Sequence, residues 1–516
     1  MKNTFKKFVA GMCCTALASS MMMMASAEGK SFEATSDNVK ITGRTDYNSD
    51  TLWMSSSAAT VEFECEGESV TFNFNSPAAR NRVQVLINGK EAYKGECLNQ
   101  GSFTVDLEEG KNDVKLIKLF EATGGILGIE DIVVDGGEAI SPAAAKTHKI
   151  EFIGDSITCG YGTDEALGGT YSYKNTDGSK AYAYQTAMRL DADASLFAAS
   201  GWGIYSGYTG GDKPSTSQLI PDYYSKVSPK TWTKVGTPGQ YLSDVDWDFS
   251  TFVPEAVVIN LGTNDDSYFS KHRDESDEFV DAYVEFLKQV RTNNPDAQIF
   301  CVLGIMGDGM FGDIEKAVEQ YKSEAQDDKV VTFKLSPIDT KDGYAVDYHP
   351  LPITHAKAAD EMADFISQTM GWDVVSYDEL KDQDDYNGFA PAEDPKDPEE
   401  DPKEDPQEDP KEEPTEEPTE EPTESTPEVT PAPADVTPAE VKPADETPAQ
   451  TKEATKAEDK TTTANNDKKD STAAAENKAA AATTTTTENP STGTAAGLAL
   501  ITLMGGAVIA VKRKKQ

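Results

Sequence analysis

The chain has 516 residues, of which 90 are acidic and 47 basic, and its formal net charge is −43. Nucleic-acid binding needs clustered lysine and arginine to neutralise phosphates, so this balance excludes nucleic acid as an expected partner. The six cysteines and four histidines show no spacing typical of a metal site. We therefore expect no metal and no cofactor.

Residues 1–27 have the features of a secretory signal peptide. Lysines near the start precede a mostly apolar stretch, which ends in Ala25-Ser26-Ala27 before Glu28. A membrane anchor in this place would need a longer apolar run. The mature chain is expected to begin at residue 28 and to act outside the cell.

Residues 28–145 are expected to form a β-sandwich, of the jelly-roll-like kind. The run Val61-Glu62-Phe63-Glu64-Cys65 alternates apolar and polar residues, as a half-buried strand does. Another run meets Asn88-Gly89, a favoured two-residue hairpin turn. Whether this domain contacts carbohydrate or only supports the next domain stays open, as does a disulfide between Cys65 and Cys97.

Residues 146–372 change to strands that alternate with helices. Four apolar runs are typical of buried parallel strands: 150–153, 256–259, 299–303 and 330–335. Between them, large apolar residues from Phe279 to Val290 repeat with the period of a helix face. This alternation predicts a layered α/β fold with its functional residues at the carboxyl ends of the strands.

Two short motifs at such strand ends indicate acyl-transfer chemistry. Gly154-Asp155-Ser156 follows the first apolar run, and Asp347-Tyr348-His349-Pro350 comes nearly two hundred residues later. A serine hydroxyl is a weak nucleophile until a histidine takes its proton, and a carboxylate commonly fixes the tautomer of that histidine. We therefore expect Ser156 as the nucleophile, His349 as the base, and Asp347 as the group that orients His349.

Two further patches, Ser200-Gly201-Trp202-Gly203 and Gly262-Thr263-Asn264-Asp265, also follow strands. In this order, the four patches resemble the SGNH (GDSL-like) hydrolases. With the preceding β-sandwich, the runs 154–162 and 260–265 are similar to carbohydrate esterase family two. Those proteins are two-domain acetyl esterases acting on plant cell-wall polysaccharides, and the similarity covers about residues 35–372.

The resemblance implies a three-layer α/β/α hydrolase domain and a Ser-His-Asp acyl-enzyme mechanism that removes O-acetyl groups from xylan or glucomannan. It also implies an oxyanion hole formed by the backbone N–H groups of Ser156 and Gly201 and the side-chain amide of Asn264. The chain departs from the family at Gly304-Ile305-Met306, where Gly-Pro-Met is usual, and in a long 205–245 segment. Both are expected near the substrate cleft.

These departures make the identity of the substrate less certain from the sequence than the type of reaction. One alternative is an SGNH esterase or lipase for another acyl ester or for a bacterial glycan. A second is a wall-anchored glycan-binding adhesin whose esterase fold is inert. Three aromatic residues, Tyr161, Trp202 and Trp247, are candidates for sugar contact or for core packing.

Residues 373–488 are expected to be a disordered, extended stalk that spans the cell wall. Pro/Glu/Thr repeats give way to Ala/Thr-rich sequence, and the segment holds 35 acidic and 11 basic residues. It offers few large apolar side chains whose burial would offset the entropy lost on ordering.

Residues 489–516 resemble a sortase sorting signal. Asn489-Pro490-Ser491-Thr492-Gly493 precedes an apolar stretch and a basic tail. By resemblance, sortase cleaves between Thr492 and Gly493 and joins the chain to peptidoglycan, while asparagine in place of the usual leucine leaves the sortase class open. A permanent membrane anchor is the alternative. We expect a wall-anchored surface protein of a Gram-positive bacterium, with membrane contact only through this apolar helix before cleavage.

Overall fold

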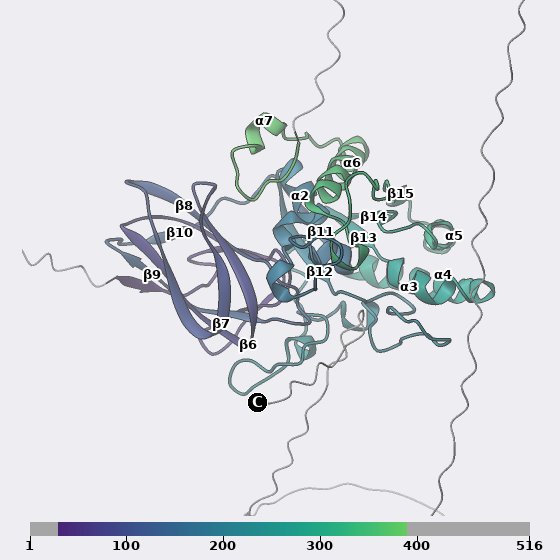
Figure 1. The fold of residues 1–516 in the computed structure, drawn as a ribbon, viewed down its shortest axis with the longest axis horizontal. Coiled ribbons are helices and arrows are strands. Elements are labelled where there is room, and N and C mark those ends of the chain that lie inside the picture. Colours follow the sequence, from purple (N-terminus) through teal and green to yellow (C-terminus); the bar gives the residue numbers. More distant parts are fainter. Residues whose placement is uncertain (1–28, 390–516) are drawn as a thin grey trace, which may run out of the picture. The chain divides into compact units, whose positions relative to one another are not determined.

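The computed structural model describes residues 29–389 of the chain (Figure 1). The expected signal peptide, sorting signal and most of the expected stalk lie outside the described residues. No helix between residues 29 and 389 is long and apolar enough to cross a membrane. We call residues 29–145 the β domain and residues 146–389 the α/β domain.

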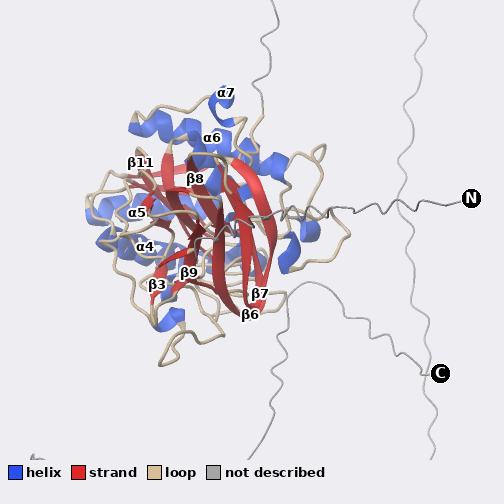
Figure 2. Cartoon of the chain, turned by 90° about the vertical axis from the view of Figure 1, so that its left-hand side faces the viewer, coloured by secondary structure: helices blue, strands red, loops and turns tan. Residues whose placement is uncertain are grey.

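The β domain is built from ten antiparallel strands. They are β1 (Lys30–Phe32), β2 (Lys40–Thr42), β3 (Thr45–Tyr47), β4 (Leu52–Met54), β5 (Thr60–Glu66), β6 (Ser69–Ile87), β7 (Lys90–Asp106), β8 (Lys111–Lys118), β9 (Leu127–Asp135) and β10 (Ile140–Pro142). The sheet order is β10-β5-β8-β6-β9-β4-β3, with β1, β2 and β7 paired at its sides. Figure 2 shows the long strands of this domain curving.

Strand β6 makes the corner of this sheet. Its first part pairs with β9 and its last part with β8, while β7 follows it on the other side. The register with β7 shifts between Ser76 and Asn81, where an irregular stretch lets the strand bend. The curled sheet encloses a core that includes Phe63, Phe72 and Leu116. The expected β-sandwich domain is confirmed as an all-β domain, and it is formed by one curled antiparallel sheet.

The α/β domain has a five-stranded parallel sheet in the order β12-β11-β13-β14-β15. The strands are β11 (His148–Gly154), β12 (Ala192–Ala198), β13 (Ala256–Asn260), β14 (Gln298–Leu303) and β15 (Val330–Lys334). The helices are α1 (Ser156–Cys159), α2 (Tyr182–Arg189), α3 (Thr263–Phe269), α4 (Ser276–Asn293), α5 (Phe311–Ala325), α6 (Pro352–Met370) and α7 (Tyr377–Leu380).

Helices cover both faces of this sheet, as Figure 1 shows. Strand residues such as Ile259 and Leu303 pack against α3, α4 and α5, and residues such as Phe152 and Val258 pack against α2 and α6. The expected three-layer α/β/α arrangement is confirmed. The chain leaves β11 toward β12 on one side and returns to β13 on the other, so β11 marks the switch point where α/β folds place their sites.

The long 205–245 segment, whose fold the sequence did not define, packs against the β domain. It contains short 3-10 turns at Pro221–Tyr223 and Leu242–Asp244. A small core joins the two domains here and contains Trp53, Ile126, Val227, Val235 and Leu242. The insertion therefore stabilises the contact between the domains.

Arg44 of the β domain is buried beneath this insertion. Its guanidinium donates to Glu151 of β11 at 2.8 Å, to the carbonyl of Tyr224 at 2.5 Å and to the carbonyl of Lys226 at 2.7 Å. The Tyr224 hydroxyl donates to the other carboxylate oxygen of Glu151 at 2.6 Å. Burial of an ion pair is tolerated when its remaining donors and acceptors are satisfied in this way.

The ordered fold continues past residue 372, where the stalk was expected to begin. Residues 373–389 return to the body and include α7. The carboxylate of Asp385 is buried and accepts hydrogen bonds from Tyr184 at 2.6 Å and Lys115 at 3.0 Å. The expected boundary at residue 372 was therefore wrong. Residues 373–389 attach to the body mainly through polar side chains, and such contacts produce no repeating apolar pattern by which the sequence could reveal them.

Candidate active site

Ser156 lies at the first position of α1, directly beyond the carboxyl end of β11. The turn is tight: a Cβ added to Gly154 would lie 2.0 Å from Oγ1 of Thr158, so only glycine lets α1 fold back onto the strand. Asp155 caps the helix by accepting the N–H of Ile157 at 3.0 Å. Burial raises the pKa of Asp155 to about 7, and the nearby charge of Asp265 acts in the same direction.

Ser156 and His349 meet in the geometry of a nucleophile and its general base. The distance from Oγ of Ser156 to Nε2 of His349 is 2.8 Å. The pKa of His349 is lowered to about 4, mainly because burial penalises the charged imidazolium. The imidazole is therefore neutral at physiological pH, which is the form that accepts a proton from a serine hydroxyl.

The expected contact between the Asp347 carboxylate and His349 is absent, which is a correction. Nδ1 of His349 lies 3.2 Å from the backbone carbonyl oxygen of Asp347, and the carboxylate instead accepts a hydrogen bond from the Tyr161 hydroxyl at 2.8 Å. The backbone explains the difference. Asp347 and Tyr348 both adopt left-handed conformations, with φ of 54° and 62°, which turn the carbonyl toward the ring.

Tyr161 is a site residue whose role sequence reasoning left open. Its ring stacks on the imidazole of His349, with centroids 4.2 Å apart, and on Tyr171 at 3.8 Å. This stacking holds the imidazole ring of His349 in place, and the hydrogen bond to Asp347 holds the loop that carries His349. A tyrosine two residues after Cys159, at the exit of α1, was the only sequence signal for it.

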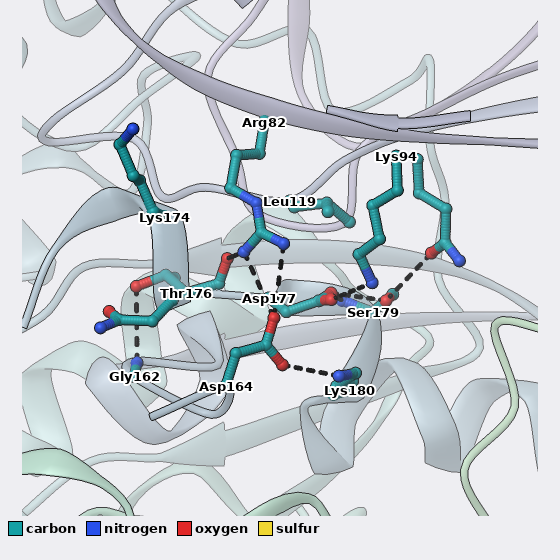
Figure 3. A network of polar contacts seen from close by, with 12 residues as sticks. Arg82, Lys94, Leu119, Gly162, Asp164, Lys174, Thr176, Asp177, Ser179 and Lys180 are labelled. Carbon is teal, nitrogen blue, oxygen red and sulfur yellow. Dashed lines mark hydrogen bonds and ion pairs between the residues drawn. The ribbon is translucent and has the colours of Figure 1, made fainter. Parts of the chain in front are cut away.

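Contacts with the β domain hold the segment that carries the two tyrosines. In Figure 3, Lys94 and Arg82 of the β domain form ion pairs with Asp177 and Asp164. The Lys94–Asp177 pair is 2.7 Å apart and the Arg82–Asp164 pair is 3.3 Å apart. Asp177 is buried, and burial raises the pKa of its carboxyl. The pKa is nevertheless lowered overall, because the charge and hydrogen bond of Lys94, the hydrogen bond of Ser179 and the charge of Lys180 together outweigh the cost of burial.

The strand ends bring the expected oxyanion-hole residues to one edge of the sheet. In the strand register, Gly154 is the partner of Ala198 in β12 and of Asn260 in β13. Gly201 follows β12 with φ of 81°, which favours glycine, and its N–H makes no hydrogen bond within residues 29–389. The N–H of Ser156 begins a helix and has no acceptor within it.

Asn264, the third expected donor, is already engaged. Its amide nitrogen donates to Asp155 at 3.1 Å and to the carbonyl of Trp202 at 2.8 Å. An amide has two hydrogens, so Asn264 reaches an oxyanion only by sharing one of them. In this structure its main effect is to tie together the ends of β11, β12 and β13.

Asp265 has a structural role that the sequence did not reveal. Its buried carboxylate accepts the backbone N–H groups of Ile204 at 3.2 Å and of Tyr205 and Ser206 at 2.8 Å. Burial raises its pKa to about 6 even though these bonds act in the opposite direction. The carboxylate fixes the chain that leaves the Gly201 turn.

Two of the three aromatic candidates are packing residues. Trp202 is buried in the core of the α/β domain, and Trp247 packs beside the guanidinium of Arg44. None of the four cysteines within residues 29–389 forms a disulfide, and all four are buried. This part of the chain contains no group of three or more side chains placed to hold a metal ion.

The fold and the serine–histidine pair define a class, the GDSL-like serine hydrolases. Residues 152–357 match the GDSL-like lipase/acylhydrolase family, and residues 41–143 match the carbohydrate esterase 2 N-terminal family.

Three relatives narrow the class. An acetylxylan esterase/glucomannan deacetylase of Cellvibrio japonicus is 30% identical over 292 residues, which are 51% of this chain and 72% of that protein. The cellulase/esterase CelE of Acetivibrio thermocellus is 32% identical over 61% of this chain. The chain spans only 37% of the length of CelE. A family two carbohydrate esterase from Clostridium thermocellum, solved with cellohexaose, has 31% identity and a TM-score of 0.56, covering 64% of this chain and 99% of that one.

The chain belongs to carbohydrate esterase family two, a family of carboxylic ester hydrolases. The matched regions coincide with the β domain and the α/β domain.

Proposed function

We propose that this protein removes O-acetyl groups from plant cell-wall polysaccharides such as xylan and glucomannan. The observation that carries the proposal is the 2.8 Å contact between Ser156 and a neutral His349 at the sheet edge. The acetyl and polysaccharide parts of the proposal are supported by family membership and by the relative named an acetylxylan esterase/glucomannan deacetylase.

The proposed reaction has two halves. Oγ of Ser156 attacks the ester carbonyl carbon while Nε2 of His349 takes its proton, and the N–H groups of Ser156 and Gly201 stabilise the oxyanion. The intermediate collapses, the sugar oxygen leaves with the proton from His349, and an acetyl-serine remains. His349 then deprotonates a water molecule that attacks this ester, which releases acetate and restores the serine.

An exposed aromatic residue beside the base supports a carbohydrate substrate. Tyr348 directly precedes His349 and is 64% exposed. Its ring contacts Tyr344, with centroids 5.7 Å apart, and the carbonyl of Tyr344 accepts the N–H of the exposed Leu167 at 3.0 Å. An exposed aromatic face on the residue that precedes the base is suited to stacking on a pyranose ring.

The proposal includes a location outside the cell, at the wall of a Gram-positive bacterium. It rests on the sequence of the two ends of the chain, which lie beyond residues 29–389. In this proposal, sortase joins Thr492 to peptidoglycan. Immunoblotting of wall and membrane fractions, for the wild type and for Thr492→Ala, tests it: the variant is expected to leave the wall fraction.

The activity is tested by acetate release from acetylated xylan, acetylated glucomannan and an acetylated bacterial glycan, beside hydrolysis of nitrophenyl esters of increasing acyl length. We expect release from the plant polysaccharides and a preference for acetyl. A preference for long acyl chains or for the bacterial glycan would favour another esterase. Glycan binding without any hydrolysis would favour an adhesin with an inert site.

A further inference from the structure

Glu121 is a buried carboxylate of the β domain that reaches into the α/β domain. It lies in the connection between β8 and β9 and is only 4% exposed. An ionisable side chain is rarely buried to this extent unless its oxygens are hydrogen-bonded, because desolvation is costly. Its partners therefore indicate what it does.

All the hydrogen-bond partners of Glu121 belong to the active-site region. Oε2 accepts the backbone N–H of Ser200 at 2.8 Å and the thiol of Cys159 at 3.7 Å. Oε1 accepts the Tyr171 hydroxyl at 3.2 Å. Ser200 directly precedes Gly201, Cys159 ends the helix that Ser156 begins, and Tyr171 stacks on the tyrosine that holds His349.

The Gly201 turn depends on hydrogen bonds for its conformation. A Cβ added at Gly201 would find its nearest neighbour, on the Gln218 side chain, at 3.8 Å, so no close packing confines this side of the turn. Asp265 fixes the chain after the turn, from residue 204 to residue 206. Glu121 fixes the chain before it, at Ser200. A buried carboxylate therefore holds each end of the turn.

Lys118, at the base of the loop that carries Glu121, is a second buried ionisable side chain, and its charge interacts with that of Glu121. Lys118 is buried and donates to the carbonyl of Ser55 at 2.7 Å. Burial lowers the pKa of Lys118 to about 7, and Glu121 opposes this fall. A negative charge behind an oxyanion hole works against the transition state, so the acceptor oxygen of Glu121 is the useful feature of this residue.

We propose that Glu121 is a positioning residue for catalysis, which makes the β domain part of the catalytic apparatus. By accepting the N–H of Ser200, it fixes the Ala199–Ser200 peptide plane, which directly precedes the peptide that carries the N–H of Gly201, and so helps to aim that N–H at the developing oxyanion. The proposal rests on the proposed esterase function.

Two substitutions and one control separate positioning from stability. Glu121→Met keeps the length of the side chain and removes its acceptors, whereas Glu121→Gln keeps an acceptor oxygen. The matched control is Lys40→Met, because Lys40 of the β domain bonds Asp193 at the opposite end of β12, at 2.8 Å. Each protein is assayed with an acetyl ester for kcat and KM, and its melting temperature is measured.

Loss of one oxyanion donor typically costs about 10²–10³ in kcat. For a misaimed donor we expect Glu121→Met to lower kcat about 10-fold to 100-fold with little change in KM. We expect Glu121→Gln to stay within about 3-fold of wild type, and Lys40→Met to keep its kcat whatever happens to its melting temperature. Unchanged kcat in Glu121→Met, or equal losses in the Met and Gln variants, would overturn the proposal.

Amide hydrogen exchange at Ser200 and Gly201 provides a readout that needs no turnover and no stable Met variant. In the wild type, the bond to Glu121 should protect the Ser200 amide, and Glu121→Gln should retain this protection. Glu121→Asp, with a shorter side chain, should exchange faster at Ser200 while exchange at residues 204–206 stays unchanged. Equal exchange in wild type and Glu121→Asp would contradict the positioning role. If the wild type protects the Ser200 amide but releases no acetate, the hydrogen bond from Ser200 to Glu121 is present and the proposed esterase function is refuted.

Discussion

At the scale of single residues, a main-chain oxygen replaces the carboxylate of the expected triad. Nδ1 of His349 faces the carbonyl of Asp347, so the tautomer that Ser156 needs is set without a side-chain anion. The carboxylate of Asp347 acts through Tyr161, which stacks on the imidazole. The serine–histidine pair and its aromatic support thus form the working unit.

Substitution of Asp347 should therefore have a mild effect. Asp347→Asn leaves the backbone carbonyl and an acceptor for Tyr161 in place, and we expect kcat to fall less than about 5-fold. His349→Ala removes the base and should lower kcat by at least about 10³. Steady-state kinetics on an acetyl ester measures both. A loss of about 10⁴ in Asp347→Asn is the outcome for a carboxylate that fixes the tautomer, and it would contradict this geometry.

The half-buried base, His349, also predicts activity at acidic pH. The pKa of His349 is lowered from its ordinary value of 6.5 to about 4. The imidazole therefore stays mostly neutral as the pH falls from neutral to about 5, and it becomes protonated below about pH 4. We expect kcat/KM to hold from neutral pH down to about pH 5 and to fall below about pH 4. In the same window the unfolded chain binds this proton first, so the contribution of His349 to stability decreases as pH falls from 6.5 toward 4.

A pH–rate profile of kcat/KM, with stability followed in parallel by circular dichroism, measures this. An acidic limb near pH 6.5 in a protein that is still folded would show that the imidazole is not desolvated as described.

The sequence predicted the serine and histidine that the structure places in contact. It did not predict the residues whose role depends on contacts between distant parts of the chain. Ser156 and His349 lie in short motifs that a sequence reader can recognise. The Ser156 motif directly follows an apolar strand and begins with a glycine, which indicates a tight turn. The orientation of Asp347 depends on two consecutive left-handed residues, Asp347 and Tyr348, and non-glycine residues adopt that backbone uncommonly. Glu121 carries no motif at all, because its partners lie on other elements and far along the chain.

At the scale of elements, the Arg44–Glu151 pair joins the β domain to strand β11 of the parallel sheet. Both side chains are buried, and removal of the arginine would leave the carboxylate of Glu151 with the Tyr224 hydroxyl as its sole side-chain partner among residues 29–389. A buried pair broken in this way typically costs about 3–5 kcal/mol. We expect Arg44→Met to lower the free energy of unfolding by about that amount.

Denaturant unfolding measures this cost, and the exposed pair of Lys90 and Asp384, 3.4 Å apart, supplies the matched control. Lys90→Met should change the free energy of unfolding by less than about 1 kcal/mol, because solvent screens the pair. Similar small effects in both variants would mean that the buried arginine does not hold the domains together.

The parallel sheet and its helices could be predicted from the sequence because each has its own apolar period. The 205–245 insertion could not, since its short 3-10 turns have no such period, and its apolar residues pack against Trp53 and Ile126 of the other domain. A core that is shared between two domains combines residues from distant parts of the chain, so the apolar pattern of one segment does not predict it.

At the scale of the whole molecule, residues 373–389 belong to the folded body. Asp385 neutralises Lys115 and accepts from Tyr184, and its carbonyl accepts from Gln185 at 2.7 Å. A chain that ends at residue 372 loses these contacts. We expect it to melt at least about 5 °C below a chain that ends at residue 389.

Differential scanning calorimetry on the two chains checks this, with Asp385→Asn in the longer chain as the control for the charge alone. The variant should melt between the two. Equal melting temperatures for the two chains would show that residues 373–389 add nothing to the fold.

The central claim is that Ser156 and His349 form a working acetyl esterase site for polysaccharide. Acetate release from acetylated glucomannan and acetylated xylan, by residues 29–389 with and without Ser156→Ala, tests it most directly. The account predicts steady release by the wild type and a loss of at least about 10³ in the variant. Release that persists in Ser156→Ala, or none from either polysaccharide by the folded wild type, would contradict it.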